Sequence, residues 1–497
     1  MVSHQVAKED ASQGGTQREL LRHFGNNVQP ELVSRVEAAI AAMVLKHPVL
    51  QVGIVDADSK APRWVRLESL DLRDHIEWKS LGSSEDWDEA SKSWATSRLD
   101  ATYPDIDKRP GWTVIVLHVP GTTFLELLFT WNHPHADGMS GKIFHQDLFQ
   151  YFQTGGRDMV KPQLHDGILK IPDSPRLPPP IEKAIKLPIE LGYAVKTVWQ
   201  ELRPPMFCRN SFLANWAPIR TSPYKTQLRA FAIKNDILTN ILSACRRNKT
   251  TLTGLMNGLT LVSLASRLKE AAAPAFQSIT AVSLRPYIPP GPRDYPWLIP
   301  MQTMGNYVTI LPHVFEETLV STLRSKLMPE DTTAATAAGE EQVLLSADVL
   351  EVLWSTAANV RREIERKQEL GVKNNQVGLM KFVGDWRQQM AETTRKPRQN
   401  SWFITNLGVL DGRPQKHDIG DDGDDDNDDD SWSICRAQFA CSAETTSAAF
   451  IISPMTAAGG DLSIVGTWQE CIFDVRFGEQ VMADLETWLL QIGAGSS

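Results

Sequence analysis

The chain has 497 residues, of which 42% are hydrophobic and 22% charged, with a formal net charge of −9 at pH 7. This length allows two sizeable hydrophobic cores, and the composition argues against global disorder. The sequence contains neither an apolar N-terminal segment nor an apolar run long enough to span a bilayer, so we expect a cytoplasmic protein without a membrane span.

The negative charge is concentrated in one segment. Residues 418–430 hold nine aspartates, so the rest of the chain is neutral overall. Like charges at this density repel one another, and we expect a disordered surface insertion rather than a calcium loop. No basic stripe is interleaved with aromatic residues, so the sequence gives no support for nucleic-acid binding.

The first half of the chain has the pattern of an α/β domain. We expect residues 1–27 to be disordered, because they are polar and terminal. Beyond them, hydrophobic periodicity predicts a helix, a strand and a hairpin in this order: helix 31–46, strand 49–55, and hairpin strands 112–119 and 124–131. A further helix is predicted over 140–152, directly after the second hairpin strand.

Prolines between residues 172 and 180 mark the clearest linker, because they stiffen an extended segment and disfavour regular pairing. We therefore predict an N-terminal subdomain at 28–172, a linker at 173–185 and a C-terminal subdomain at 186–497. The second half again alternates strands and helices, with strand 227–233, helix 255–268 and strand 279–284.

One segment has the composition of a catalytic site. Residues 132–138 read Asn-His-Pro-His-Ala-Asp-Gly and lie between the strand at 124–131 and the helix at 140–152. Imidazole is basic and mostly neutral near pH 7, so His133 is a candidate general base. Asp137 can buttress the turn by pairing with a cation, and Gly138 permits a sharp turn without a Cβ penalty.

The placement of this segment resembles the active-site segment of CoA-dependent acyltransferases with the chloramphenicol acetyltransferase fold. That group includes plant BAHD enzymes and peptide-synthetase condensation domains. The order of several segments more narrowly resembles the fungal alcohol acetyltransferase family: 45–50, 132–138, 283–287, 304–308, 405–409 and 462–468.

The resemblance implies two similar α/β sandwich subdomains with an active-site channel between them. By position, it makes His133 the general base and Asp137 a structural residue paired with Arg285, with Gly138 supporting the turn. It places four further residues at the CoA or substrate channel: Thr405, Asn406, Gly408 and Asn306. Among them, Asn406 and Gly408 are expected on a crossing strand near the pantetheine arm.

The same resemblance implies an O-acyltransferase that moves an acyl group, with acetyl as the leading expectation, from acyl-CoA to a small alcohol or secondary metabolite. Direct transfer needs no permanently bound cofactor and no metal, and we expect a monomer. An N-acyltransferase or condensation-type enzyme of the same fold, or a non-catalytic binding member, are alternatives. The expected first strand ahead of the helix at 31–46 is not evident in the sequence.

A metal-dependent hydrolase is a more distant alternative, because His133, His135 and Asp137 echo a His-x-His-x-Asp-His metal motif. Gly138 stands where the next ligand would be, and no histidine occurs between His165 and His313. On the acyltransferase reading, His135 is a solvent-facing or loop-bonding residue. The basic segment 246–249 could meet CoA phosphates or simply be a solvated helix end, and the sequence favours the latter.

Overall fold

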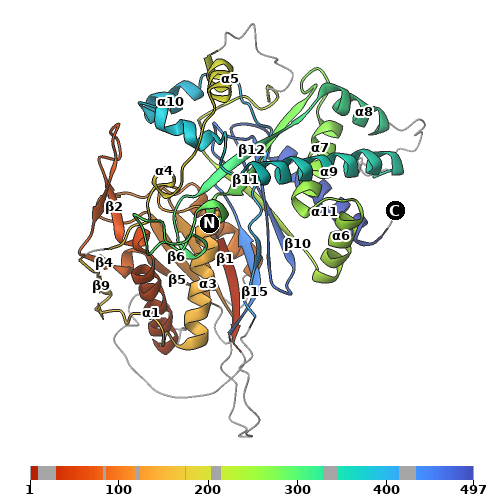
Figure 1. Ribbon diagram of the computed structural model, residues 1–497. Helices are drawn as coiled ribbons and strands as arrows, with labels where there is room; N and C mark the ends of the chain where they lie inside the picture. Colours follow the sequence, from red (N-terminus) through yellow and green to blue (C-terminus); the bar gives the residue numbers. More distant parts are fainter. Residues whose placement is uncertain are drawn as a thin grey trace.

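Two β-sheets with flanking helices organise the protein (Figure 1). The computed structural model describes residues 2–8, 30–81, 86–118, 122, 124–173, 175–202, 214–327, 345–413 and 432–495. The acidic insertion predicted at 418–430 lies outside these residues, and so do residues 9–27 of the segment predicted to be disordered.

The first sheet has five strands in the order β15-β1-β7-β6-β5. Its strands are β1 (Val2–Lys8), β5 (Ile76–Ser80), β6 (Trp112–His118), β7 (Phe124–Trp131) and β15 (Trp432–Phe439). The hairpin predicted from the sequence is present as antiparallel β6 and β7, with Thr113 opposite Thr130. β5 joins the other side of β6 in parallel.

The prediction of a disordered N-terminus is wrong for residues 2–8. They form β1, which pairs antiparallel with β7 on one side and β15 on the other. The sequence Val-Ser-His-Gln-Val-Ala-Lys has few strongly strand-forming residues, so local propensity does not identify it. Hydrogen bonding to two neighbouring strands stabilises it instead, and this is the first strand that the sequence did not reveal.

β15 comes from the C-terminal part of the chain but belongs to the first sheet. The C-terminal part, predicted as a separate subdomain over 186–497, therefore contributes a strand to the N-terminal sheet. The predicted linker at 173–185 is not simply extended, because α4 (Ile181–Ala184) lies within it and packs against Leu284 and Tyr307. The boundaries at 172 and 186 stay a prediction.

The first sheet is covered on both faces, as the alternation of its side chains requires. α1 (Pro30–Lys46) and α3 (Gly138–Thr154) lie side by side on one face, where Val114, Val116, Leu127 and Phe129 enter a common core with both helices (Figure 1). Neighbouring positions Ile115, Leu117 and Leu128 point to the other face, against α2 (Trp87–Leu99).

The strand predicted over 49–55 begins later than expected. Residues Pro48–Gln51 form the 3-10 helix η2, and β2 (Val52–Val55) follows and pairs with β3 (Arg63–Arg66). A second small sheet has the order β4-β9-β8, from the strands β4 (Ser69–Asp71), β9 (Ile168–Lys170) and β8 (Leu164–His165).

The second large sheet follows the order β10-β17-β16-β13-β11-β12, with β14 paired to β16. Its strands are β10 (Thr226–Ile233), β11 (Phe276–Ser283), β12 (Val308–Phe315), β13 (Trp402–Ile404), β14 (Gly408–Leu410), β16 (Phe450–Ala457) and β17 (Leu462–Gln469). The strands predicted at 227–233 and 279–284 are β10 and β11, with small differences at their ends.

The helices that share a core with this sheet gather on one side of it (Figure 1). They are α6 (Asn235–Arg247), α7 (Leu252–Arg267), α8 (Glu317–Leu327), α9 (Ala347–Leu370) and α11 (Val475–Gly493). The helix predicted at 255–268 is α7, capped by Thr251, whose hydroxyl accepts a hydrogen bond from the Gly254 amide at 3.2 Å. A second core with Leu259, Trp402 and Trp468 forms between helices and sheet.

The other described helices are α5 (Leu191–Leu202), α10 (Trp386–Thr393) and the 3-10 helices η3 (Leu72–Asp74), η6 (Arg285–Tyr287), η7 (Pro300–Gln302) and η8 (Gln376–Phe382). Among them, η3 adds Leu72 to the first core. Within the described ranges, no helix combines the length and the apolar content needed to cross a bilayer. The arrangement places the end of β7 close to the end of β11, which positions the site.

Candidate active site

The predicted motif forms a tight turn between β7 and α3. Asp137 is the N-cap of α3, because its Oδ1 accepts a hydrogen bond from the Ser140 amide at 2.9 Å. At the other end of the turn, Trp131 Nε1 donates to the Ala136 carbonyl at 2.8 Å. These bonds fix the backbone on both sides while leaving His133 exposed.

Asp137 and Arg285 form the ion pair that the resemblance implied. Nη1 and Nη2 of Arg285 lie 2.6 and 3.0 Å from the two Asp137 oxygens, a bidentate geometry. The side chains are only 0% and 3% exposed, so water does not screen the pair. Asp137 also accepts bonds from the Ser140 hydroxyl at 2.8 Å and the Tyr307 amide at 2.9 Å.

Arg285 also donates hydrogen bonds to the segment ahead of β12. Nη2 donates to the carbonyls of Thr303 at 3.2 Å and Gly305 at 3.0 Å. Ser140 Oγ bonds both the amide and the carbonyl of Gly305, at 2.9 and 2.8 Å. The buried network therefore ties the start of α3, the end of β11 and residues 303–307 into one rigid unit.

Tyr307 lies against this network. Its hydroxyl donates to the Pro179 carbonyl at 2.7 Å, which attaches the predicted linker to the site. Burial raises the pKa of the Tyr307 phenol far above its usual value, although the nearby Arg285 guanidinium opposes the rise. The phenol is therefore a structural hydrogen-bond donor rather than an acid or base.

Asn306 contacts the candidate base directly. Its Nδ2 lies 3.0 Å from Nδ1 of His133 and 3.2 Å from the His133 carbonyl oxygen. The sequence placed Asn306 only at a channel, whereas the geometry makes it the partner that orients the imidazole. With Nδ1 engaged, Nε2 is the ring nitrogen left for a substrate.

His135 is buried, so the expectation of a solvent-facing residue is wrong, whereas loop bonding is correct. Its Nε2 lies 3.1 Å from the Val52 carbonyl, and its ring packs edge-on against Trp64. Burial lowers the pKa of His135 to about 4, so the ring is neutral at pH 7. His133, His135 and Asp137 thus take separate partners and do not converge on one point, unlike the ligands of a metal motif.

Gly138 has no positive φ, so its place in the turn does not require glycine for that reason; it is the first residue of α3. A Cβ there would lie 3.0 Å from both Leu407 Cδ2 and Phe439 Cζ, so the glycine provides space for two side chains. Through Leu407, the loop between β13 and β14 reaches the start of α3.

Thr405 and Asn406 lie in that loop, and Gly408 is the first residue of β14, so only Gly408 is on a strand. The strand that crosses to the other sheet is β15, which corrects the expectation for Asn406 and Gly408. Asn406 Nδ2 donates to Thr253 Oγ1 at 3.1 Å, and its Oδ1 accepts from the Gly408 amide at 2.8 Å. Thr405 is buried and bonds Ser453.

Ser140 is the site residue that sequence reasoning missed. An N-cap Asp accepts a hydrogen bond from the backbone amide two or three residues on, so a predicted cap at Asp137 points to residue 139 or 140. The signal could have placed Ser140 beside Asp137, but not beside Gly305, which is 165 positions away.

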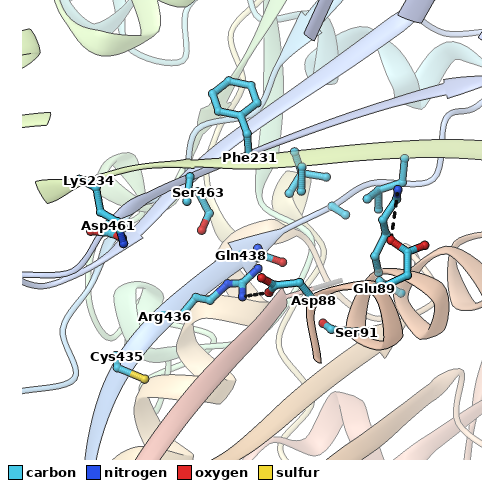
Figure 2. A pocket seen from close by; sticks show the side chains of 17 residues that line it. Asp88, Glu89, Ser91, Phe231, Lys234, Cys435, Arg436, Gln438, Asp461 and Ser463 are labelled. Atoms are coloured by element: carbon cyan, nitrogen blue, oxygen red, sulfur yellow. Dashed lines mark hydrogen bonds and ion pairs between the residues drawn. The ribbon is translucent and has the colours of Figure 1, made fainter. Parts of the chain in front are cut away.

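A cavity of about 540 Å³ lies elsewhere, between α2, β10, β15 and β17 (Figure 2). None of the predicted site residues lines it. Figure 2 shows Arg436 paired with Asp88, and Lys234 with Asp461, so its charged groups neutralise one another. The chemistry therefore favours the turn at His133 over this cavity.

The protein has the chloramphenicol acetyltransferase-like fold, which comparison with solved structures shows. A trichothecene 15-O-acetyltransferase, TRI3, from Fusarium sporotrichioides superposes with a TM-score of 0.65 at 13% identity, covering 99% of this chain and 90% of that one. The condensation domain of the monacolin K polyketide synthase MokA gives 0.54 at 12% identity, covering 99% and 92%. Both likenesses confirm the predicted fold class.

The family model of the alcohol acetyltransferases matches residues 78–296, a range that includes His133, Asp137 and Arg285. A probable alcohol acetyltransferase, FCK4, from Fusarium pseudograminearum (strain CS3096) is 27% identical over 470 residues, which cover 92% of this chain and 86% of that protein. The predicted resemblance to the fungal alcohol acetyltransferases is confirmed, and the protein is an acyltransferase.

Proposed function

We propose that the protein is an acyl-CoA-dependent O-acyltransferase that moves an acetyl group to the hydroxyl of a small, largely apolar alcohol or secondary metabolite. The observation that carries the proposal is the exposed His133 imidazole on a rigid turn, engaged at Nδ1 by Asn306 and open at Nε2. The alcohol acetyltransferase relatives support the acyl group and the acceptor class.

The reaction is direct transfer. His133 takes the proton of the acceptor hydroxyl as its oxygen attacks the thioester carbonyl, forming a tetrahedral oxyanion. Collapse breaks the carbon–sulfur bond, and the departing CoA thiolate takes the proton from the imidazolium. Ester and free CoA leave together, so neither an acyl-enzyme nor a permanent cofactor is required.

The Asn306 amide governs which tautomer of His133 is present. For Nε2 to accept a proton, the ring hydrogen must reside on Nδ1. In the orientation described above, Asn306 donates to Nδ1; with the amide turned over, Oδ1 accepts the Nδ1 hydrogen and leaves the Nε2 lone pair free. Because a turned amide would bring Oδ1 to the His133 carbonyl oxygen that Nδ2 now binds at 3.2 Å, we assign to the reactive state an Asn306 side chain that has turned over and moved away from that carbonyl.

Asp137 and Arg285 act without touching substrate, because both are buried and satisfied by one another. Their part is to hold residues 303–307, and hence Asn306, against the turn that carries His133. Thr405, Asn406 and Gly408 border the donor side of the site in this proposal, and Gly138 leaves room for Leu407.

The test uses the purified protein with acetyl-CoA and a panel of alcohols and amines, following free thiol release and acylated product. Ester formation that depends on an alcohol supports the proposal. Product only with amines would replace it with an N-acyltransferase. Absence of any acceptor-dependent thiol release from folded protein would contradict it and favour a non-catalytic member of the fold.

A further inference from the structure

A basic groove of about 490 Å³ lies on the surface between the α6–α7 corner and α9 (elements in Figure 1). Two stretches more than a hundred positions apart in the chain form it. Its lining residues are Arg246, Arg247, Asn248, Lys249, Ala358, Arg361, Arg362 and Glu365. The segment 246–249, which the sequence favoured as a solvated helix end, is thereby joined by two further arginines.

The groove has a marked excess of positive charge. Five of its side chains are cationic and only Glu365 is acidic, whereas the whole chain has a net charge of −9. Glu365 is already paired with Arg361 at 2.6 Å. Within the described ranges, Arg246, Arg247 and Lys249 form no ion pair, so their charges are available to an anionic ligand.

The backbone of the groove is held in place before any ligand arrives. Lys249 adopts a left-handed conformation with φ of 53°, and Asn248 Nδ2 donates to the Ala244 carbonyl at 3.0 Å. The buried Thr250 hydroxyl donates to the Ala357 carbonyl at 2.7 Å, which fixes the corner against α9. Preformed positions lower the entropic cost of binding.

Two chains of contacts lead from the groove toward the candidate active site. Thr253, in the first turn of α7 and four positions after Lys249, bonds Asn406, whose neighbour Leu407 reaches Gly138. Along β12, His313 contacts Glu363, beside Arg362 on α9, and this strand begins two residues after Asn306. Both routes end at the turn that holds His133.

We propose that this groove binds the phosphorylated nucleotide end of the acyl-CoA, namely the 3′-phosphate and the diphosphate. The inference rests on the proposed function, because it supplies the donor's charged end to the same site. A phosphate monoester carries about −1.5 to −2 charges near pH 7, and arginine forks match its oxygens in pairs.

The test measures binding of adenosine 3′,5′-bisphosphate to the full chain, which does not require turnover. The variants are Lys249→Gln, Arg362→Gln and the double variant. Lys249 and Arg362 lie on opposite walls of the groove, so each single substitution removes one positive charge from one wall and the double variant removes both. Lys269→Gln is the matched control, since Lys269 is exposed and lies beyond the opposite end of α7. We expect the double variant to weaken binding about tenfold and the control to bind like wild type.

Steady-state kinetics of acetyl transfer provide a second test. Wild type should show a lower KM for acetyl-CoA than for 3′-dephospho-acetyl-CoA, and the double variant should lose this preference with kcat unchanged. Unaltered nucleotide binding in the double variant would overturn the proposal. Displacement of adenosine 3′,5′-bisphosphate by inorganic phosphate at equal concentration would also overturn it. A third contrary result would be variants that lose binding to vesicles of anionic lipid but still bind the nucleotide like wild type.

The two proposals can fail separately. Groove-dependent binding of adenosine 3′,5′-bisphosphate without any acyl transfer would refute the proposed function and retain the groove. Acyl transfer with equal KM values in wild type and double variant would retain the function and refute the groove.

Discussion

Asp137 and Arg285 are 148 positions apart, and they form a buried bidentate ion pair that links the first sheet to the second. Asp137 caps the helix that follows β7, and Arg285 follows β11. Because the same arginine binds the Thr303 and Gly305 carbonyls, the pair also fixes the segment that carries Asn306. The geometry of His133 thus depends on two residues that are themselves buried beneath it.

Replacing Asp137 with Asn should destabilise the protein by about 3–5 kcal/mol, because Arg285 would remain buried without a countercharge. The free energy of unfolding, measured with urea, tests this. Asp56→Asn is the matched control: Asp56 pairs with Arg63 at 2.7 Å on the exposed surface, and its loss should change stability little. Equal effects of the two substitutions would contradict the burial argument.

His135 should make stability depend on pH. Its folded pKa of about 4 lies below the ordinary 6.5, so between these values the unfolded chain binds more protons than the folded one. The contribution is complete above pH 6.5 and is lost as pH falls toward 4. At pH 5 the loss should be about 2 kcal/mol relative to pH 7.

His135→Gln isolates this effect, because an amide can still donate to the Val52 carbonyl but does not titrate. Unfolding at pH 7 and pH 5 should show a smaller pH dependence for this variant than for wild type. The exposed His165→Gln serves as control and should behave like wild type. If His135→Gln keeps the full wild-type slope, His135 is not buried as described.

Asn306→Ala should lower kcat about tenfold with little change in the KM for acetyl-CoA, because one hydrogen bond that sets the imidazole tautomer is lost. Asn306→Asp retains an acceptor for the Nδ1 hydrogen and should keep more activity than the alanine variant. Steady-state kinetics of both variants decide the matter. An aspartate variant less active than the alanine variant would show that donation to Nδ1 is what turnover needs.

Much of the site could be predicted because its signals are local. The hydrophobic run before His133 and the helical spacing after it define β7 and α3, and these bracket the turn. Asp137 lies four positions after His133, within the same turn, so a buttressing role could be predicted from the sequence. Its pairing with Arg285 was implied by the family resemblance and not by spacing.

Other features depend on contacts between distant segments, which periodicity does not encode. β1 is stabilised by pairing on both edges, although its own sequence is weakly strand-forming. Asn306 meets His133 across 173 positions, and Arg361 and Arg362 meet 246–249 only when α9 packs beside α7. The burial of His135 likewise follows from β2 and Trp64, not from the motif.

The central claim is that His133 is the general base, and the rate of acetyl-CoA turnover by His133→Ala tests it most directly. The account predicts kcat lower by about 10²- to 10⁴-fold with an unchanged free energy of unfolding, because His133 is exposed and its loss leaves no buried group unpaired. His165→Ala, another exposed histidine, should retain wild-type turnover. A folded His133→Ala protein with wild-type kcat would contradict the claim.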